Sequence, residues 1–322
     1  MLKVLVVDLD LGQLRALAAV VDAGTLEAAA RQLHVTTSAV SQRLRALESA
    51  TGRVLLVRSR PVRPTASGER VLQLARQVSL LVADASAALG APDDDGDGPG
   101  GPAADGRWVR PPVLPIAVNA DSLATWVLPA LAHLAGPEAE VCLDLRREDQ
   151  SYTARLLRDG SVVGAITSDA EVVPGCSVQP LGALRYLAVA TPEVVDRWFS
   201  AGVTARALAR APVVVFDRDD DLQDAWLAAR SGAGEHLDPP RHHVPASVDF
   251  SEAVRLGWGW ALLPEVHAAA DLEAGRLVLL DQAPVDVPLH WQQWKLRSPA
   301  LDAVATALVS AARAALVPPP SP

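Results

Sequence analysis

A run of polar side chains near the N-terminus has the chemistry needed to read nucleic acid. It combines hydroxyl, amide and guanidinium groups: Thr37, Ser38, Ser41, Gln42, Arg43 and Arg45. Hydroxyl and amide groups hydrogen-bond to base edges in the major groove, and guanidinium groups bind guanine or backbone phosphate. We therefore predict that this face contacts DNA. The alternative is the solvated face of an ordinary helical hairpin.

A second basic group follows shortly afterwards. The segment VLLVRSRPVRP begins as a short apolar strand and continues with Arg58, Arg60 and Arg63, interleaved with Pro61 and Pro64. Between Arg31 and Arg63 the chain has seven arginines and one acid, Glu48. This density of positive charge is typical of a surface that binds phosphates. We expect Arg58, Arg60 and Arg63 to contact phosphates or the minor groove.

Apolar residues at helical spacing predict the elements that position these side chains. Two stripes lie close together: Leu26, Ala29, Ala30 and Leu33, then Val40, Leu44 and Leu47. An earlier helix begins near Leu11 and ends at Gly24. Three helices followed by a basic wing predict a winged helix-turn-helix domain over residues 8–66.

This segment resembles the DNA-binding domain of LysR-type transcriptional regulators. The family pattern is matched between Leu11 and Gly68 by Ala28, Ala29, Leu33, Ser38, Ala39, Val40, Ser41, Leu44, Leu47, Glu48, Gly52, Leu55, Leu56, Arg58, Pro64, Thr65 and Gly68. At the start of the second helix, Thr36, Thr37 and Ser38 stand where the family often has Ser-Gln-Pro. The resemblance implies a DNA-binding regulator that is not an enzyme.

A single helix is predicted over residues 67–89. Its apolar residues alternate spacings of three and four, as in the seam of a coiled coil: Val71, Leu74, Val78, Leu81 and Ala85. The alternative is a helix that packs only on its own domain. In the family that the chain resembles, this element is the dimerisation helix, and the resemblance implies a homodimer that assembles further into a homotetramer.

The charge is unevenly distributed along the chain. The net charge is −9, but residues 1–89 contain 11 Lys and Arg against 7 Asp and Glu, whereas residues 90–322 contain 18 against 31. A basic N-terminal segment joined to an acidic remainder is compatible with binding double-stranded DNA. Residues 90–108 are rich in Gly, Pro and Asp, which predicts a flexible linker.

From about residue 109 the pattern changes to alternating strands and helices. This alternation predicts an α/β domain over 109–317 with a sheet dominated by parallel strands. The LysR-type resemblance implies a two-lobed, periplasmic-binding-protein-like effector domain. We expect lobe one at about 113–185 and 286–317, and lobe two at about 186–285.

Polar residues at the ends of the predicted strands are candidates for an effector site, because ligands bind there in such folds. The candidates are Asn119, Asp121, Ser122, Thr125, Glu148, Asp149, Thr167, Ser168 and Asp217. The helix start at 121–125 offers free N–H groups and hydroxyls to a carboxylate, and Glu148, Asp149 and Asp217 could pair with a cationic side chain. A basic amino acid fits both features. The alternative is that these acids are solvated loop residues.

A second, narrower resemblance concerns the C-terminal part. The segments NADSLATW, PLGALRYLAVA, FDRDDDLQD, AVRLGWGWALLPE and WQQWKLRSP, spread from 119 to 299, are similar to the ArgP/LysG branch of the LysR-type family. That branch senses L-lysine and L-arginine and activates an exporter of basic amino acids. Its members have also been described as inhibitors of chromosome replication initiation. The resemblance implies L-lysine or L-arginine as effector and RNA polymerase as a partner.

Other classes find little support in the sequence. No histidine stands in a metalloprotease or nucleophile motif, and Cys142 and Cys176 lack metal-ligand spacing, so we expect no catalytic residues, metal or cofactor. No run of 18 apolar residues predicts a membrane span, and we expect a cytoplasmic protein. Two alternatives remain: a two-lobed solute-binding protein, and a replication-origin or nucleoid DNA-binding protein without ligand control.

Overall fold

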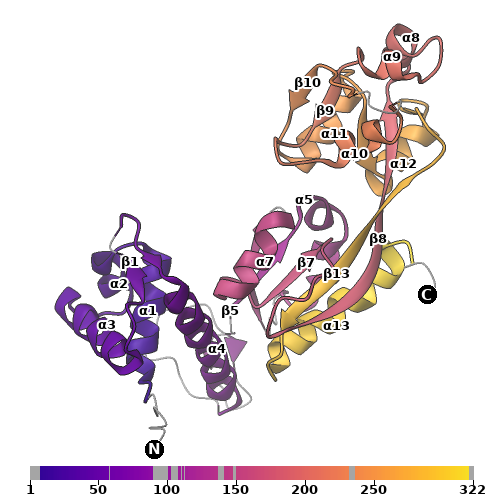
Figure 1. The fold of residues 1–322 in the computed structure, drawn as a ribbon. Coiled ribbons are helices and arrows are strands. Elements are labelled where there is room, and N and C mark those ends of the chain that lie inside the picture. Colours follow the sequence, from indigo (N-terminus) through magenta and orange to yellow (C-terminus); the bar gives the residue numbers. More distant parts are fainter. Residues whose placement is uncertain are drawn as a thin grey trace, which may run out of the picture.

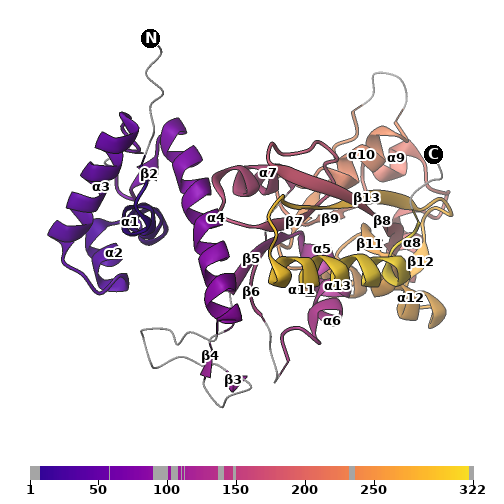
Figure 2. The same cartoon turned by 90° about the horizontal axis from the view of Figure 1, so that it is seen from below.

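The computed structural model describes residues 8–57, 59–89, 101–102, 108–109, 111, 113–136, 141–147, 150–231 and 236–318. Figures 1 and 2 show an N-terminal head, a long helix beside it, and a larger α/β domain made of two lobes. The predicted fold class is confirmed: an α/β protein with a winged helix-turn-helix head, a connecting helix and a two-lobed domain.

The head contains three helices and a two-stranded wing: α1 (Leu11–Ala23), α2 (Leu26–Gln32), α3 (Thr37–Thr51), β1 (Leu56–Val57) and β2 (Arg63–Pro64). Thr25 caps α2 and Thr36 caps α3, each accepting a hydrogen bond from a backbone N–H of the first turn. Gly24 ends α1 in the left-handed conformation. The predicted apolar stripes meet in the core of the head, where Ala29, Val40 and Leu47 are fully buried.

Helix α4 (Ala66–Ala88) joins the head to the α/β domain. Leu72 and Ala75 pack into the core of the head, whereas Leu80, further along the helix, packs into the core of the α/β domain. Within the predicted linker, a short antiparallel pair is found between β3 (Gly101–Pro102) and β4 (Trp108–Val109). Residues 90–100 and 103–107 lie outside the described residues.

A seven-stranded sheet runs through the α/β domain in the order β11–β8–β13–β7–β5–β6, with β12 paired to β8. Its strands are β5 (Val113–Val118), β6 (Cys142–Arg147), β7 (Gly164–Thr167), β8 (Cys176–Ala190), β11 (Ala261–Pro264), β12 (Val278–Leu279) and β13 (Val285–Trp294). Only β5 pairs in parallel, with β6 and β7, and the other pairs in this sheet are antiparallel. The expectation of a sheet dominated by parallel strands was therefore wrong.

The two longest strands explain this difference. β8 has 15 residues and β13 has 10, and they run antiparallel to each other from one lobe into the other. Alternation of strands and helices along the sequence does not reveal two strands that cross between lobes, because it carries no information on strand direction. In lobe two a smaller parallel pair forms between β9 (Val213–Val215) and β10 (Arg241–His243).

The helices are distributed over the two lobes. Lobe one has α5 (Ala120–Ser122), α6 (Leu128–Leu131), α7 (Gln150–Asp159) and the C-terminal α13 (Pro299–Ala315), and lobe two has α8 (Pro192–Trp198), α9 (Ala205–Leu208), α10 (Leu222–Ala228), α11 (Ser247–Arg255) and α12 (Glu265–Glu273). Between α5 and α6 the backbone widens into a π-helix, η1 (Leu123–Val127). Pro129 has no N–H for the preceding turn, which accounts for the break in the helical ladder just before it. No helix among the described residues is long and apolar enough to cross a membrane.

Candidate DNA-binding face and effector cavity

Helix α3 presents most of its predicted polar side chains to solvent. Thr37, Ser38, Gln42 and Arg45 are exposed and Ser41 is half-buried. Arg43 is also half-buried and lies beside the start of α1, where its Cζ is 3.8 Å from the position of a Cβ on Gly12. The structure therefore leaves the exposed set on one surface, and it directs Arg43 toward a neighbouring helix.

The wing is fixed to the head by backbone and side-chain hydrogen bonds. Glu48, the one acid of this region, accepts a hydrogen bond from the Leu55 N–H at 2.8 Å, so its carboxylate is engaged by the wing. Gly68 lies so close to the wing that a Cβ would stand 1.9 Å from the Leu55 carbonyl oxygen, which excludes every other residue. Arg60 and Arg63 are exposed, and Arg58 lies outside the described residues.

A hollow of about 570 Å³ is lined by residues of the helices and of the wing. Its lining includes Ser41 and Arg45 of α3 together with Arg60 of the wing. Residues from two different predicted groups thus line one concave surface. A surface with hydroxyl and guanidinium groups from a helix and a wing can hold a duplex by base edges and phosphates together.

The predicted dimerisation residues lie along one side of α4. Leu74, Leu81 and Ala85 are exposed and Val78 is half-buried, whereas Val71 packs against the core of the head. An exposed apolar stripe on a helix is typical of a surface that a partner covers. Four of the five predicted residues therefore form an uncovered face.

A cavity of about 390 Å³ lies between the two lobes. Its lining combines the start of α5, the crossing strands and the loop before α10: Asn119, Ala120, Asp121, Tyr186, Phe216, Asp219, Asp220, Asp221, Leu222, Gln223, Ala225, Phe250, Leu262 and Val287. Among the described residues that line it there are four aspartates and no Lys, Arg or His. The volume lies in the range of about 300–1,000 Å³ that is usual for small-molecule sites.

Asp121 connects the lobes at one end of this cavity. Its carboxylate accepts a hydrogen bond from the Tyr186 hydroxyl at 2.8 Å and another from the Ser247 hydroxyl of α11 at 3.0 Å. Burial raises the pKa of Tyr186 well above its usual value, and the negative charge of Asp121 raises it further. The phenol therefore stays a hydrogen-bond donor.

Asp220 supplies the second acidic group of the cavity. Its carboxylate accepts hydrogen bonds from the backbone N–H groups of Leu222 at 3.1 Å and Phe216 at 3.3 Å. The pKa of Asp220 is raised, mainly by burial and also by the neighbouring charges of Asp121 and Asp217, although the two backbone hydrogen bonds oppose the shift. A cation in the cavity would remove much of this cost, because it would compensate the buried charge.

The predicted effector residues are only partly brought together. Asn119 and Asp121 line the cavity, whereas Ser122 is fully buried behind it and Thr125 donates its hydroxyl to the Asp121 carbonyl at 2.6 Å. Asp217 accepts from the N–H groups of Asp219 and Asp220 and so shapes the loop. Thr167 and Ser168 do not line the cavity, and Glu148 and Asp149 lie outside the described residues.

Sequence reasoning did not single out Tyr186, Ser247 or Gln223. Gln223 is 2% exposed, and its Oε1 has no hydrogen-bond partner among the described residues although it borders the cavity. A buried amide oxygen without a partner is costly unless a ligand or water satisfies it. The run of four acids before α10, residues 217 and 219–221, was the one sequence signal that could have found Asp220.

The winged head, the connecting helix and the two-lobed domain with its cavity define a ligand-responsive DNA-binding regulator. Residues 11–69 match the family model described as bacterial regulatory helix-turn-helix protein, lysR family, and residues 111–314 match the LysR substrate binding domain. The chain belongs to the LysR family of bacterial transcriptional regulators. It is a regulator rather than an enzyme, as the family predicts.

The chain is similar to named regulators along nearly its whole length. It is 44% identical to the HTH-type transcriptional regulator LysG of Mycobacterium tuberculosis, over 94% of both chains. It is 41% identical to the lysine export transcriptional regulatory protein LysG of Corynebacterium glutamicum, over 93% of this chain and 97% of that protein. The solved structure of full-length LysG of C. glutamicum with bound effector Arg matches with a TM-score of 0.76 at 38% identity, covering 96% of this chain and all of that one. The expected resemblance to the ArgP/LysG branch is confirmed.

Proposed function

We propose that this regulator senses L-lysine or L-arginine in the cytoplasm and controls, as an activator acting with RNA polymerase, a gene for the export of basic amino acids. It would bind double-stranded DNA as a homodimer that assembles into a homotetramer. The cavity supports the effector, the exposed stripe on α4 supports the dimer, and similarity to named relatives supports the target.

The acidic lining of the cavity supports an effector with a positively charged side chain. Asp121 and Asp220 stand at a site whose described lining contains no basic side chain. A ligand with a positively charged side chain would pair with these carboxylates, whereas an acidic ligand would be repelled by them. The raised pKa of Asp220 supports the same choice, because it indicates a buried charge without a compensating cation.

The cavity also offers hydrogen-bond acceptors to the ammonium or guanidinium groups of a basic amino acid. Asn119 and the start of α5 border the cavity, and the buried Oδ1 of Asn119 has no hydrogen-bond partner among the described residues. Gln223 offers a second such oxygen on the opposite lobe. Both are acceptors, and acceptors of this kind suit the N–H groups of an ammonium or guanidinium ion. Of the predicted effector residues, we retain Asn119 and Asp121, and we add Asp220 and Gln223.

The relatives support both the effector and the target. LysG of C. glutamicum is named for lysine export, and its solved structure has Arg bound as effector. Similarity over more than nine-tenths of both chains includes the segments that form the cavity here, residues 119–121, 186 and 216–225. The uncovered stripe on α4 supports dimerisation, which would present two heads to one duplex.

Calorimetry on the full chain with L-lysine, L-arginine and uncharged norleucine tests the effector. We expect lysine or arginine to bind and norleucine to bind at least about tenfold more weakly. Footprinting on random and promoter DNA, with and without lysine, tests the regulatory part. Equal footprints on all DNA that do not respond to either amino acid would instead identify a replication-origin or nucleoid DNA-binding protein without ligand control.

A further inference from the structure

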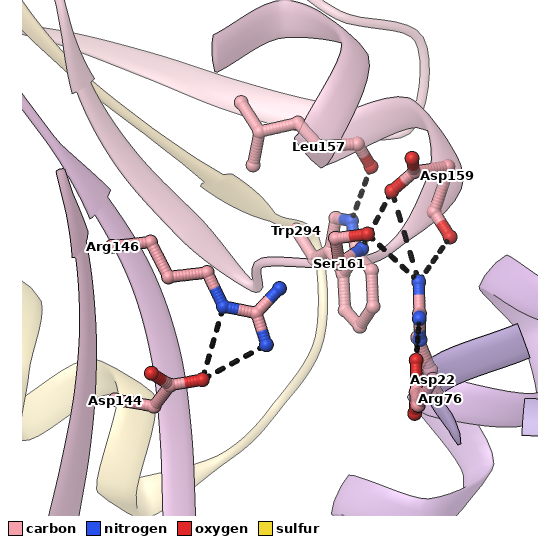
Figure 3. Close-up of polar contacts among 8 residues, drawn as sticks. All are labelled: Asp22, Arg76, Asp144, Arg146, Leu157, Asp159, Ser161 and Trp294. Atoms are coloured by element: carbon pink, nitrogen blue, oxygen red, sulfur yellow. Dashed lines mark hydrogen bonds and ion pairs between the residues drawn. The ribbon is translucent and has the colours of Figure 1, made fainter. Parts of the chain in front are cut away.

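A single arginine on α4 contacts both the DNA-binding head and lobe one. The guanidinium group of Arg76 forms an ion pair with Asp22 at the end of α1 through Nη2. Through Nη1 it donates to the Asp159 carbonyl oxygen at 2.9 Å and to the Ser161 hydroxyl at 3.1 Å. Figure 3 shows Arg76 between Asp22 on one side and the Asp159–Ser161 turn on the other.

The lobe-one side of this contact is built into the fold. Asp159 ends α7, and its carboxylate accepts the Ser161 N–H at 2.8 Å while its Oδ1 lies 3.7 Å from Arg76 Nη1. The Arg76 and Asp159 side chains are only 16% and 18% exposed, so solvent screens their interaction less than that of a surface pair. The hydrogen bond from the Ser161 N–H to Asp159 helps to fix the turn that accepts Arg76.

The backbone of α4 also approaches lobe one closely at this point. Gly160 has a φ of +77°, and a Cβ on it would lie 3.1 Å from the Gln73 Cα and 2.9 Å from Trp294 Cζ2. Trp294 is itself fixed, since its indole N–H donates to the Leu157 carbonyl at 3.1 Å. Glycine is thus the residue that lets α4 and lobe one meet without displacing a buried tryptophan.

The contact remains available when α4 dimerises. Successive residues of an α-helix are turned by about 100°, which places Arg76 roughly half a turn from the stripe of Leu74, Val78 and Leu81. The exposed stripe and the Arg76 contact therefore occupy opposite sides of one helix. A partner that covers the stripe leaves the contact with Asp22 and Asp159 in place.

We propose that Arg76 is the positioning residue that holds the head against lobe one and transmits effector-dependent movement of lobe one to the head. The planar guanidinium group uses separate N–H groups for the two sides, which a lysine ammonium cannot reproduce. Release of Asp22 would break this contact on the head side, and displacement of the Asp159–Ser161 turn would pull on α4, which packs into the head through Leu72 and Ala75. The transmission half of this proposal rests on the effector control proposed above.

The test compares Arg76→Met and Arg76→Lys with the control Arg158→Met in the full chain. Arg158 is exposed on α7 next to Asp159, so the control removes the same charge from the same neighbourhood. Three quantities are measured: amide hydrogen exchange without ligand, the Kd for L-arginine, and the ratio of Kd values for a selected DNA duplex with and without saturating L-arginine. The duplex is obtained by selection from random DNA with the wild-type protein.

We expect both Arg76 variants to keep the L-arginine Kd within about twofold, and to bring the ratio of DNA Kd values close to one. Exchange should become faster at residues 20–24 and 159–161, and Arg158→Met should match the wild type in all three measurements. Unchanged exchange at these residues in Arg76→Met would overturn the role of Arg76 in holding the head, and a wild-type ratio of DNA Kd values would overturn its role in transmission. If Arg76→Met does not fold, Asp22→Asn replaces it and removes only the ion pair to the head. This variant should fold, because the Asp22 side chain is 50% exposed.

The two proposals fail in distinguishable ways. If the wild-type chain binds neither lysine nor arginine, the proposed effector is wrong, and hydrogen exchange still decides whether Arg76 holds the head. If the amino acids bind and alter DNA affinity equally in the wild type and in both Arg76 variants, the effector is right and Arg76 does not transmit its signal.

Discussion

The Ser247 hydroxyl of lobe two donates to the Asp121 carboxylate of lobe one at 3.0 Å, across a separation of 126 residues in the sequence. Tyr186, on a strand that runs through both lobes, donates to the other oxygen of the same carboxylate. One side chain of lobe one therefore receives hydrogen bonds from a crossing strand and from a helix of lobe two, and the distance from Asp121 to Ser247 depends on how far the lobes are closed.

Ser247→Ala should weaken effector binding by about tenfold, because it removes a hydrogen bond between the lobes that stabilises the closed arrangement. Such a bond to a charged group contributes about 1.5–3 kcal/mol, and 1.4 kcal/mol is tenfold in affinity. Calorimetry with L-arginine measures the change. Ser177→Ala, which removes a long 3.4 Å hydrogen bond on lobe one, is the control. Equal affinity in both variants would show that closure does not depend on the Asp121–Ser247 contact.

Asp220→Asn should raise the Kd for lysine and arginine by about ten- to a hundredfold, because it removes one of the charges that pair with the ligand side chain. Norleucine binding should change little, since the side chain of norleucine carries no charge. Comparing the three ligands on the wild type and the variant isolates the electrostatic contribution. An equal weakening for norleucine would mean that the substitution has altered the shape of the cavity instead.

Effector affinity should fall as the pH drops, starting at a higher pH than an ordinary aspartate would give. The raised pKa of Asp220 means that it takes up a proton earlier, and a neutral carboxyl cannot pair with a cation. Because the folded state holds this proton more tightly than the unfolded state, the ligand-free chain should lose stability as the pH rises from the unfolded pKa through the raised one. Titration calorimetry over this range measures the first effect. A pH profile that is identical in Asp220→Asn would assign it to another group.

Substitution of a wing arginine should weaken binding to all DNA sequences alike. Arg60→Gln and Arg63→Gln should each reduce the slope of log K against log salt by about 0.9 for each phosphate that the variant no longer binds. Fluorescence anisotropy at several salt concentrations measures the slope. Arg206→Gln, an exposed arginine of α9 in lobe two, makes the same charge change far from the head. A wild-type slope in both wing variants would rule out their contact with phosphate.

Leu74→Asp combined with Leu81→Asp should shift the full chain toward smaller species in analytical ultracentrifugation, because the two charges stand on the exposed stripe of α4. Ser79→Asp adds a charge at an exposed position on another side of the same helix and should leave the assembly unchanged. Unchanged sedimentation of the double variant would show that the stripe is not the interface.

The head was predictable from the sequence because its signals are local. The spacing of Val40, Leu44 and Leu47 predicts a helix with a defined polar face, and the density of arginine predicts the ligand. The cavity was less predictable because its residues come from distant segments. Nothing near Tyr186 or Ser247 in the sequence indicates that both hydroxyls reach Asp121, since that depends on the antiparallel path of β8 and on the closure of the lobes.

The same lack of long-range information explains why strand direction in the sheet was wrongly predicted, whereas the error at Thr125 is local. Strand direction in β8 and β13 is set by the crossing between lobes, which a pattern of alternating elements does not encode. Thr125 was predicted near a ligand carboxylate because of its position at a helix start. In the structure its hydroxyl is used by the Asp121 carbonyl instead, at the point where the helix widens.

Helix α4 belongs to two hydrophobic cores, through Leu72 and Ala75 at one end and Leu80 further along. Fraying of this helix therefore exposes apolar surface in the head and in lobe one at the same time. A fragment cut within α4 would expose apolar side chains that the full chain buries in the head or in lobe one. Cutting the chain within α4 would therefore affect the stability of the head and of lobe one, and not only the signal between them.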